Sequence, residues 1–385
     1  MSAKELRITI VGGGPVGLFL GICLSNLGID CTILEKRTNP VSDSRSLGIH
    51  PISMELFEKL GISDHFLRHG LKIERGIAHD GSKNLGEIDF SILKKPFNFI
   101  LACPQFETEK ILSEEFIKIN PAGFIKGAEV HAIHQDNKKE VTCRYTLDGT
   151  ERSLKSDFII GCDGKNSFVR QEAGIFYGGK RYPDTYIMGD FEDNTDFGDQ
   201  AAVFLPKQGM IECFPLPNKN RRWVVKTDKY VKKPSQKDLS GLVEERIGYD
   251  LNNLKSTMLS SFGVQHFMAE QFVKDRILLC GDSAHVVSPI GGQGMNLGWI
   301  GAWKLSKVLS KIQNNSDSIE ALFEFQKSQK RLVKKAARRA EMNMILGRKQ
   351  RLPFIKKMVV FLLLKTPLRK VAAQQFAMKK LASIN

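Results

Sequence analysis

The chain has 385 residues, of which 42% are hydrophobic and 26% are charged, with a formal net charge of +15. This composition is typical of a soluble globular protein, and the length is sufficient for two packed regions. No run approaches the roughly 20 apolar residues that span a bilayer, and no signal peptide is apparent, so we expect a cytoplasmic protein. The seven cysteines are scattered without a Cys-x-x-Cys pair, which argues against a metal site or a disulfide framework.

The positive charge is concentrated at the C-terminal end. Residues 326–385 contain 17 Lys and Arg against one acid, Glu341, whereas residues 1–325 carry 40 Lys and Arg against 41 Asp and Glu. A basic segment of this kind fits a solvated helical face, an anionic membrane surface or a nucleic-acid partner. We expect no nucleic-acid partner, because the net charge is the only feature of the sequence that favours one.

The first motif lies at the N-terminus. Residues 6–11 are short, β-branched and apolar, as in a buried parallel strand, and residues 12–17 read Gly-Gly-Gly-Pro-Val-Gly. Helical spacing follows over 18–27, and a second strand, 31–34, leads to an acid. The order of strand, glycine turn, helix, strand and acid predicts a dinucleotide-binding unit.

Each residue of this motif has a physical task. Gly12 makes the tight turn, Gly14 lets the backbone approach a pyrophosphate, and Gly17 packs the helix on the strand. The helix N-terminus offers amides and a positive dipole to phosphate. Glu35 can accept hydrogen bonds from a ribose diol, and an acid there disfavours a 2′-phosphate, so we expect FAD or NAD and not NADP as the resident nucleotide.

A second ligand signal lies more than two hundred residues later. Asp282 directly follows a strand-like run, 276–280, and precedes a Pro- and Gly-rich stretch, 289–294. A buried Asp282 would be costly without hydroxyl donors from which to accept, although it could also cap a helix. The stretch 289–294 offers backbone amides to a flat ligand. His285 is expected to pack or to hydrogen-bond structurally.

Further segments join these two signals. Asp43-x-Arg45-x-x-Gly48 follows the acid-ended strand, and Pro104-Gln105 opens a segment that ends in Glu109. A further strand begins at Asp157 and ends on Asp163-Gly164, where the chain turns into a helix. Together, over residues 5–345 and in this order, the motifs resemble the class A flavoprotein aromatic hydroxylases, the p-hydroxybenzoate hydroxylase-like family. The resemblance implies a Rossmann-like α/β FAD-binding domain with an inserted, mostly antiparallel substrate domain and a helical C-terminal tail.

The resemblance also assigns roles to residues. Asp282 would bind the ribityl chain of FAD, Asp163 and Gly164 would serve FAD and the passing nicotinamide, and Gln105 would lie near the flavin. Arg45 and Pro289 are expected at the reacting face, as catalytic residues. The expected cofactor-binding residues are Gly12, Gly14, Pro15, Val16, Gly17, Glu35, Lys36, Arg45, Gln105, Asp163, Gly164, Asp282, Pro289, Gly292, Gly294, Met295 and Asn296.

The domains are expected to interleave along the chain. The FAD-binding domain would comprise 1–75, 100–175 and 272–345, and the substrate domain 76–99 and 176–271, followed by a basic helical segment, 346–385. Short strands at regular spacing predict the antiparallel sheet of the substrate domain. The predicted strands are 184–191, 200–205, 209–216 and 221–226.

By this resemblance the protein would be an FAD-dependent monooxygenase. It would use NADPH or NADH transiently, react with O2 through a flavin C4a-hydroperoxide, and hydroxylate an apolar aromatic, polyketide or quinone-like substrate, as a monomer or homodimer. A flavin-dependent reductase of isoprenoid-type double bonds at a membrane surface is an alternative, as is a non-enzymatic flavin redox sensor. The apolar and basic run within 352–385 either touches a membrane peripherally or packs on the protein.

Overall fold

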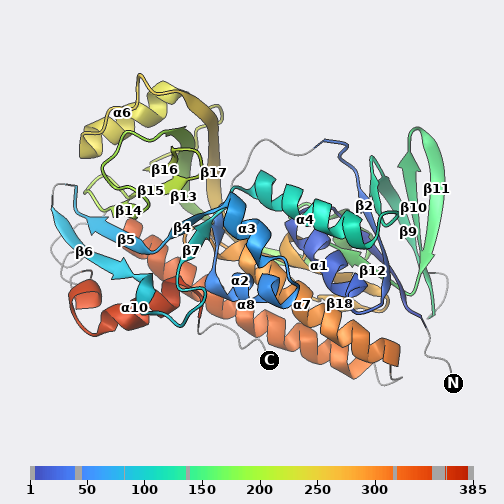
Figure 1. Ribbon diagram of the computed structural model, residues 1–385. Helices are drawn as coiled ribbons and strands as arrows, with labels where there is room; N and C mark the ends of the chain where they lie inside the picture. The colour runs from blue at the N-terminus through green and yellow to red at the C-terminus, as the bar shows by residue number, and fades with distance from the viewer. Residues whose placement is uncertain are drawn as a thin grey trace.

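The structure is a computed structural model, and it describes residues 5–39, 46–81, 83–135, 139–314, 319–348, 360 and 362–379. These residues form two regions, each built on its own sheet (Figure 1). Two long helices, α7 (Gln293–Asn314) and α8 (Ile319–Gly347), follow the second nucleotide motif and pack against each other. The end of α8 reaches the second region, where the amide of Met210 donates to the carbonyl of Gly347 over 3.2 Å.

The first region is a six-stranded sheet in the order β18–β19–β12–β1–β2–β8. Its strands are parallel except for the edge strand β18. The sheet is covered on both faces, so its inner strands are nearly continuous apolar runs. The strands are β1 (Arg7–Val11), β2 (Asp30–Glu35), β8 (Phe124–Lys126), β12 (Phe158–Gly161), β18 (Val273–Lys274) and β19 (Ile277–Leu279).

Helix α1 (Pro15–Ser25) is the central helix of this region, as the motif predicts. It packs against both α7 and α4 (Gln105–Ile119). A Cβ atom at Gly21 would lie 2.8 Å from side-chain atoms of both Ile33 and Phe116, so this glycine lets α1 sit close to the sheet and to α4. The burial of α1 on nearly all sides explains why its sequence is apolar all round.

The second region is an eight-stranded sheet in the order β20–β17–β13–β16–β15–β14–β5–β6, antiparallel except where β14 runs parallel to β5. The four predicted strands are confirmed as β13 to β16. The long strand β17 was not predicted, because its sequence mixes serines with apolar residues. The strands are β5 (Arg75–His79), β6 (Asn84–Asp89), β13 (Tyr177–Glu192), β14 (Ala201–Phe204), β15 (Ile211–Leu216), β16 (Asn220–Thr227), β17 (Ser256–Ala269) and β20 (His285–Val286).

The two faces of this sheet have different neighbours. Helix α6 (Gln236–Ile247) packs on one face, where Leu239 joins Ile211, Cys213 and Trp223 in an apolar cluster. Side chains alternate along a strand, so the intervening residues of β15 point to the opposite face. That opposite face lines the cavity described below.

Smaller elements connect the two regions. A three-stranded sheet in the order β3–β7–β4 lies beside α2 and α3, and a second, β11–β10–β9, flanks the first region and was not among the predicted strands. These elements are β3 (Gly48–Ile49), α2 (Pro51–Lys59), α3 (Ser63–His69), β4 (Leu71–Ile73), η1 (Phe90–Ile92), β7 (Ile100–Ala102), β9 (Glu129–His134), β10 (Val141–Leu147), β11 (Thr150–Ser156), α5 (Phe168–Glu172) and η2 (Gly281–Ser283).

The described part of the C-terminal segment packs on the protein. Helix α10 (Leu368–Phe376) lies against β6 and η1, where Ala373 and Ala377 contact Phe90 and Leu93. Most of the predicted apolar run at 352–365 lies outside the described residues. Within the described ranges, no helix combines the length and the apolar character that crossing a membrane requires.

Candidate active site

The glycine motif forms a turn that leaves one side open. Gly12 has φ +108°, and a Cβ atom there would lie 2.5 Å from the carbonyl oxygen of Cys162. A Cβ atom at Gly17 would lie 2.0 Å from the carbonyl oxygen of Gly12, so both positions require glycine for packing. A Cβ atom at Gly14 would meet nothing within 4 Å. The open side of Gly14, at the N-terminus of α1, is where a phosphate group can approach the backbone.

Glu35 ends β2 beside this turn. Its carboxylate accepts hydrogen bonds from the amide of Gly13 over 2.6 Å, from the amide of Arg37 over 2.9 Å and from Nε of Arg37 over 2.8 Å. Burial by itself raises the pKa of Glu35, but the hydrogen bonds and charge of Arg37 and the amide of Gly13 outweigh it and hold the pKa below its ordinary value. A carboxylate has about four acceptor positions, so one remains for a ribose hydroxyl.

Helix α4 contributes a second carboxylate near Glu35. Gln105, at the start of the helix, donates to Glu109 over 2.9 Å, and the guanidinium of Arg37 lies 3.5 Å from the other oxygen of Glu109. Burial raises the pKa of Glu109, which Gln105 and Arg37 partly offset. The three side chains line the same cavity as Glu35, so Arg37 bridges two carboxylates at the nucleotide end of the site.

Asp163 follows β12, with one carboxylate oxygen accepting from the amide of Val169 over 3.0 Å. The other oxygen is buried and has no hydrogen-bond partner among the described residues. Burial raises the pKa of the Asp163 carboxyl, while bonds from Ser167 and nearby amides lower it. Gly164 follows with φ +80°, and both residues line the cavity. An unpaired buried acceptor in a residue that lines the cavity is a group that a bound ligand or water can satisfy.

Asp282 lies in η2, after β19. The hydroxyl of Tyr177 donates to its backbone carbonyl over 3.0 Å, but no described residue donates a hydrogen bond to its carboxylate. Asp282 is exposed where it lines the cavity, yet the enclosing protein raises the pKa of its carboxyl to about 6, which the charge of Lys165 partly offsets. The carboxylate is therefore available to hydroxyl donors of a ligand.

The loop from Pro289 to Gly292 ends at α7, and it is held from below by Asn296. The Asn296 amide nitrogen donates to the carbonyl of Gly292 over 2.8 Å and to that of Gly48 over 2.9 Å, and its oxygen accepts from the amide of His50 over 2.9 Å. The ring of His50 contacts the carbonyl of Gly291 at 3.1 Å. Asn296 thus fixes the loop through its backbone, and its own side chain does not line the cavity.

His285 lies beneath the site and outside the cavity lining. It is 2% exposed, packs against Phe272 with ring centroids 6.0 Å apart, and has a pKa that burial lowers to about 4. A neutral, enclosed imidazole fits the predicted packing role.

One cavity of about 1430 Å³ joins these groups to the second sheet. At one end it is lined by the glycine turn and Glu35, and at the other by the sheet and the C-terminal segment. Its apolar wall comes from six strands and from the C-terminal segment. The wall includes Ile77, Ala78, Met188, Val203, Leu205, Phe214, Val224, Phe262, Leu364, Leu368 and Val371.

Comparison with known proteins identifies the class to which this site belongs. Residues 5–340 match the FAD binding domain family. The chain therefore belongs to that family of FAD-binding proteins, and the resemblance to class A aromatic hydroxylases is confirmed.

Particular relatives narrow the comparison. The aromatic compound monooxygenase YhjG of Bacillus subtilis strain 168, itself uncharacterised, is 31% identical over 314 residues, which is 79% of this chain and 62% of that protein. Rifampicin monooxygenase of Rhodococcus hoagii is 31% identical over 312 residues, 78% of this chain and 63% of that protein. The chain thus spans less than two thirds of the length of these relatives.

A solved structure shows the shared fold. The p-nitrophenol 4-monooxygenase of Pseudomonas putida DLL-E4 matches with a TM-score of 0.90 and 18% identity, over 100% of both chains. The predicted fold class, an α/β FAD-binding domain with a second, mostly antiparallel sheet, is thereby confirmed.

The described residues fit FAD, which is the cofactor of this family. Gly14 leaves room for a pyrophosphate, Glu35 has an acceptor left for a ribose hydroxyl, and Asp282 faces the cavity with an unpaired carboxylate. The buried free oxygen of Asp163 is a fourth observation in the same cavity. These groups provide the space for a pyrophosphate and the hydrogen-bond acceptors for hydroxyl groups that binding of FAD requires.

Most predicted cofactor residues lie together. Gly17 and Asn296 do not line the cavity and support it through packing and hydrogen bonds, and Arg45 lies outside the described residues, so its role stays a prediction. Those that line the cavity are Gly12, Gly14, Pro15, Val16, Glu35, Lys36, Gln105, Asp163, Gly164, Asp282, Pro289, Gly292, Gly294 and Met295. Sequence reasoning missed Arg37 and Lys165, although each is next to a predicted residue in the chain. It also missed Glu212, Arg222 and the C-terminal residues, because only the strand pairing and the packing of the tail bring them to the site.

Proposed function

We propose that the protein is an FAD-dependent monooxygenase that uses NADH or NADPH and O2 to hydroxylate an aromatic, polyketide or quinone-like substrate. One observation carries the proposal. A cavity of about 1430 Å³ runs from the groups that fit FAD to an apolar wall formed by the second sheet. The names of the relatives, an aromatic compound monooxygenase and a rifampicin monooxygenase, agree with this proposal.

Bound FAD would supply hydride acceptance and oxygen activation, and the chain would hold, orient and enclose it. The amides at the start of α1 would bind the pyrophosphate, and Asp282 would accept hydrogen bonds from the ribityl hydroxyls. The loop from Pro289 to Gly292 would present its backbone to the pyrimidine edge of the flavin. The apolar wall of the second sheet would exclude water from the reacting face.

Purified protein reconstituted with FAD tests the proposal. We expect a yellow protein whose NADH or NADPH oxidation is stimulated by some members of a panel of phenols, quinones and polyketides. Under 18O2 the product should carry one labelled oxygen atom. A product with a reduced double bond and no label would support the isoprenoid reductase instead, and failure to bind flavin under every reconstitution condition would refute both enzymes.

Peripheral membrane contact through residues 352–385 is a separate proposal. Leu362, which does not line the cavity, is 45% exposed near the exposed basic side chain of Lys365, an arrangement that suits an anionic lipid surface. Sedimentation with liposomes that contain anionic lipid should recover the protein, and the variant Leu362→Ser should bind less. Equal recovery of both proteins would remove the membrane contact and leave packing as the role of the segment.

A further inference from the structure

A row of side chains crosses the second sheet on the face that lines the cavity. Strand pairing places Val203 opposite both Ala78 and Glu212, then Glu212 opposite Val224, and Val224 opposite Met188. All five line the cavity. Four of them are apolar, so the row presents one carboxyl group at the centre of an apolar wall.

Glu212 has no structural partner in the part of the chain that the structure describes. It is 8% exposed, and no described residue forms a hydrogen bond or an ion pair with its carboxylate. Burial raises its pKa to about 7. A buried carboxyl without a partner destabilises a fold, and an apolar residue here would match the neighbours Met210 and Phe214. The sheet itself therefore gives no reason for this carboxyl group.

The other charged groups around this face have partners or lie at its margin. Arg222 on β16 holds Asp190 over 2.6 and 2.7 Å, and Lys226 lies 3.5 Å from Asp184. Arg181 on β13 is exposed and lines the cavity. Because Arg222 and Lys226 are already paired, the carboxylate of Glu212 is left to interact with a ligand in the cavity.

A second polar group without a hydrogen-bond partner among the described residues lies on β13, which β16 separates from the strand of Glu212. The hydroxyl of Tyr186 on β13 is buried and makes no hydrogen bond with the described residues. The charge of Glu212 raises the pKa of Tyr186 further above the value that burial already gives it, so the two groups interact electrostatically. Tyr186 does not line the cavity, so of these two groups Glu212 is the one available to a ligand there.

We propose that Glu212 is a substrate-binding residue whose carboxylate accepts a hydrogen bond from a hydroxyl group on the aromatic ring of the substrate. This inference rests on the proposed function and names the substrate as a ring with a free hydroxyl, held with its flat face against Val203, Val224 and Met188. The hydroxyl donates and the carboxylate accepts, which increases the electron density of the ring. An O-methylated ring cannot donate, so Glu212 would be left desolvated and unpaired, and the ether would be rejected.

Ligand binding to the oxidised holoenzyme tests this assignment without turnover. The probes are 2-naphthol and its methyl ether, 2-methoxynaphthalene, each titrated while the visible absorbance of bound FAD is followed. The wild-type protein should bind 2-naphthol about tenfold or more tightly than the ether. Glu212→Leu, which suits the apolar row, should bind the two probes equally and unfold at the same or a higher temperature. Glu212→Gln, which keeps a neutral acceptor, should show an intermediate preference.

Glu192→Gln is the matched control, because Glu192 ends β13 with an exposed side chain that does not line the cavity. It should keep the full preference for 2-naphthol. Equal binding of the two probes by the wild-type protein, no binding of 2-naphthol up to its solubility, or an unchanged preference in Glu212→Leu would overturn the assignment. A holoenzyme that incorporates labelled oxygen yet shows no preference would retain the proposed function and lose only this inference.

Discussion

The two ends of the cavity are built in different ways. The FAD end is made from turns that follow parallel strands, with the backbone of Gly14 and carboxylates from three separate motifs, Glu35, Asp163 and Asp282. The substrate end is a wall of side chains from paired strands, completed by the C-terminal segment. A constant ligand demands a fixed set of backbone shapes and acceptors, whereas the wall only has to enclose a particular substrate. Cofactor recognition is therefore visible in the sequence as short motifs, whereas substrate recognition depends on side chains that are far apart in the chain.

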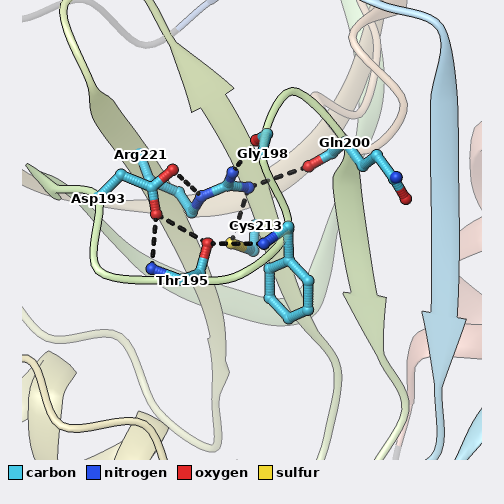
Figure 2. A network of polar contacts seen from close by, with 7 residues as sticks. Asp193, Thr195, Gly198, Gln200, Cys213 and Arg221 are labelled. Atoms are coloured by element: carbon cyan, nitrogen blue, oxygen red, sulfur yellow. Dashed lines mark hydrogen bonds and ion pairs between the residues drawn. The ribbon is translucent and has the colours of Figure 1, made fainter.

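Buried charge is also used differently at the two ends. At the FAD end, Glu35 keeps an acceptor free for a ligand. In the second region, Arg221 is 0% exposed and all its bonds are internal, to Asp193, to the carbonyls of Gly198 and Gln200, and to the sulfur of Cys213 (Figure 2). This network ties the connection between β13 and β14 to β16. It therefore fixes the strand that carries Val203 beside Glu212.

The largest expected effect comes from a substitution that destabilises the substrate end of the cavity and leaves the FAD end intact. Arg221→Met should cost about 3–5 kcal/mol of unfolding free energy, because it removes a fully buried guanidinium, the charge partner of Asp193 and the donor to the carbonyls of Gly198 and Gln200. Chemical denaturation measures the loss. Adding Asp193→Asn should recover part of it, and FAD binding by the folded fraction should be nearly unchanged. A loss below about 1 kcal/mol would show that the network is not what holds this connection.

A pair of glycine substitutions separates folding from cofactor binding at the FAD end. Gly17→Ala should cost about 2–3 kcal/mol of stability, since its Cβ would overlap the carbonyl oxygen of Gly12 at 2.0 Å. Gly14→Ala should leave apoprotein stability within about 0.5 kcal/mol of wild type, because its Cβ meets only open space. It should nevertheless weaken FAD binding at least about tenfold by filling the pyrophosphate approach. Thermal unfolding and flavin titration of both variants check this pair, and tight FAD binding by Gly14→Ala would contradict the assigned pyrophosphate site.

Removing the charge of Asp282 should weaken FAD binding without destabilising the fold. Asp282→Asn should raise the Kd for FAD by about 10- to 100-fold, the usual worth of hydrogen bonds to a charged acceptor. The apoprotein should be no less stable at pH 7, because the carboxylate has no donor among the described residues. Flavin fluorescence titration measures the Kd, with the exposed Asp64→Asn as control. Unchanged FAD affinity would move the ribityl site elsewhere.

The smallest expected effect concerns pH and the substrate end. The pKa of Glu212 is about 7 in the folded protein against an ordinary value of 4.5, so the folded state holds an extra proton between these values. Stability should therefore fall as pH rises from about 4.5 to about 7, by on the order of 2 kcal/mol. Glu212→Gln should lack this part of the decline, and Glu192→Gln should keep it. Denaturant unfolding of the apoprotein across this range would show parallel curves for all three if Glu212 were not buried as described.

Much of the FAD end could be predicted from the sequence because local rules govern it. The turn at Gly12 needs a positive φ, and Gly17 must let α1 approach the strand, so spacing alone located them. The same holds for Asp163 and Asp282, which come directly after buried strands. In contrast, Asn296 was predicted to bind the cofactor, whereas its side chain is consumed by bonds to Gly48, Gly292 and His50.

By itself the sequence determined the fold class, the FAD motifs and the order of their parts, because each depends on backbone conformation and on residues close in the chain. Only the tertiary structure decided that Glu212 faces the cavity, since its direction follows from the pairing of β15 with β14 and β16. Tertiary packing also brought the C-terminal segment to the cavity, although charge and apolarity alone left membrane contact open. Long-range pairing costs chain entropy that no local pattern records, which is why it had to be seen in the folded protein.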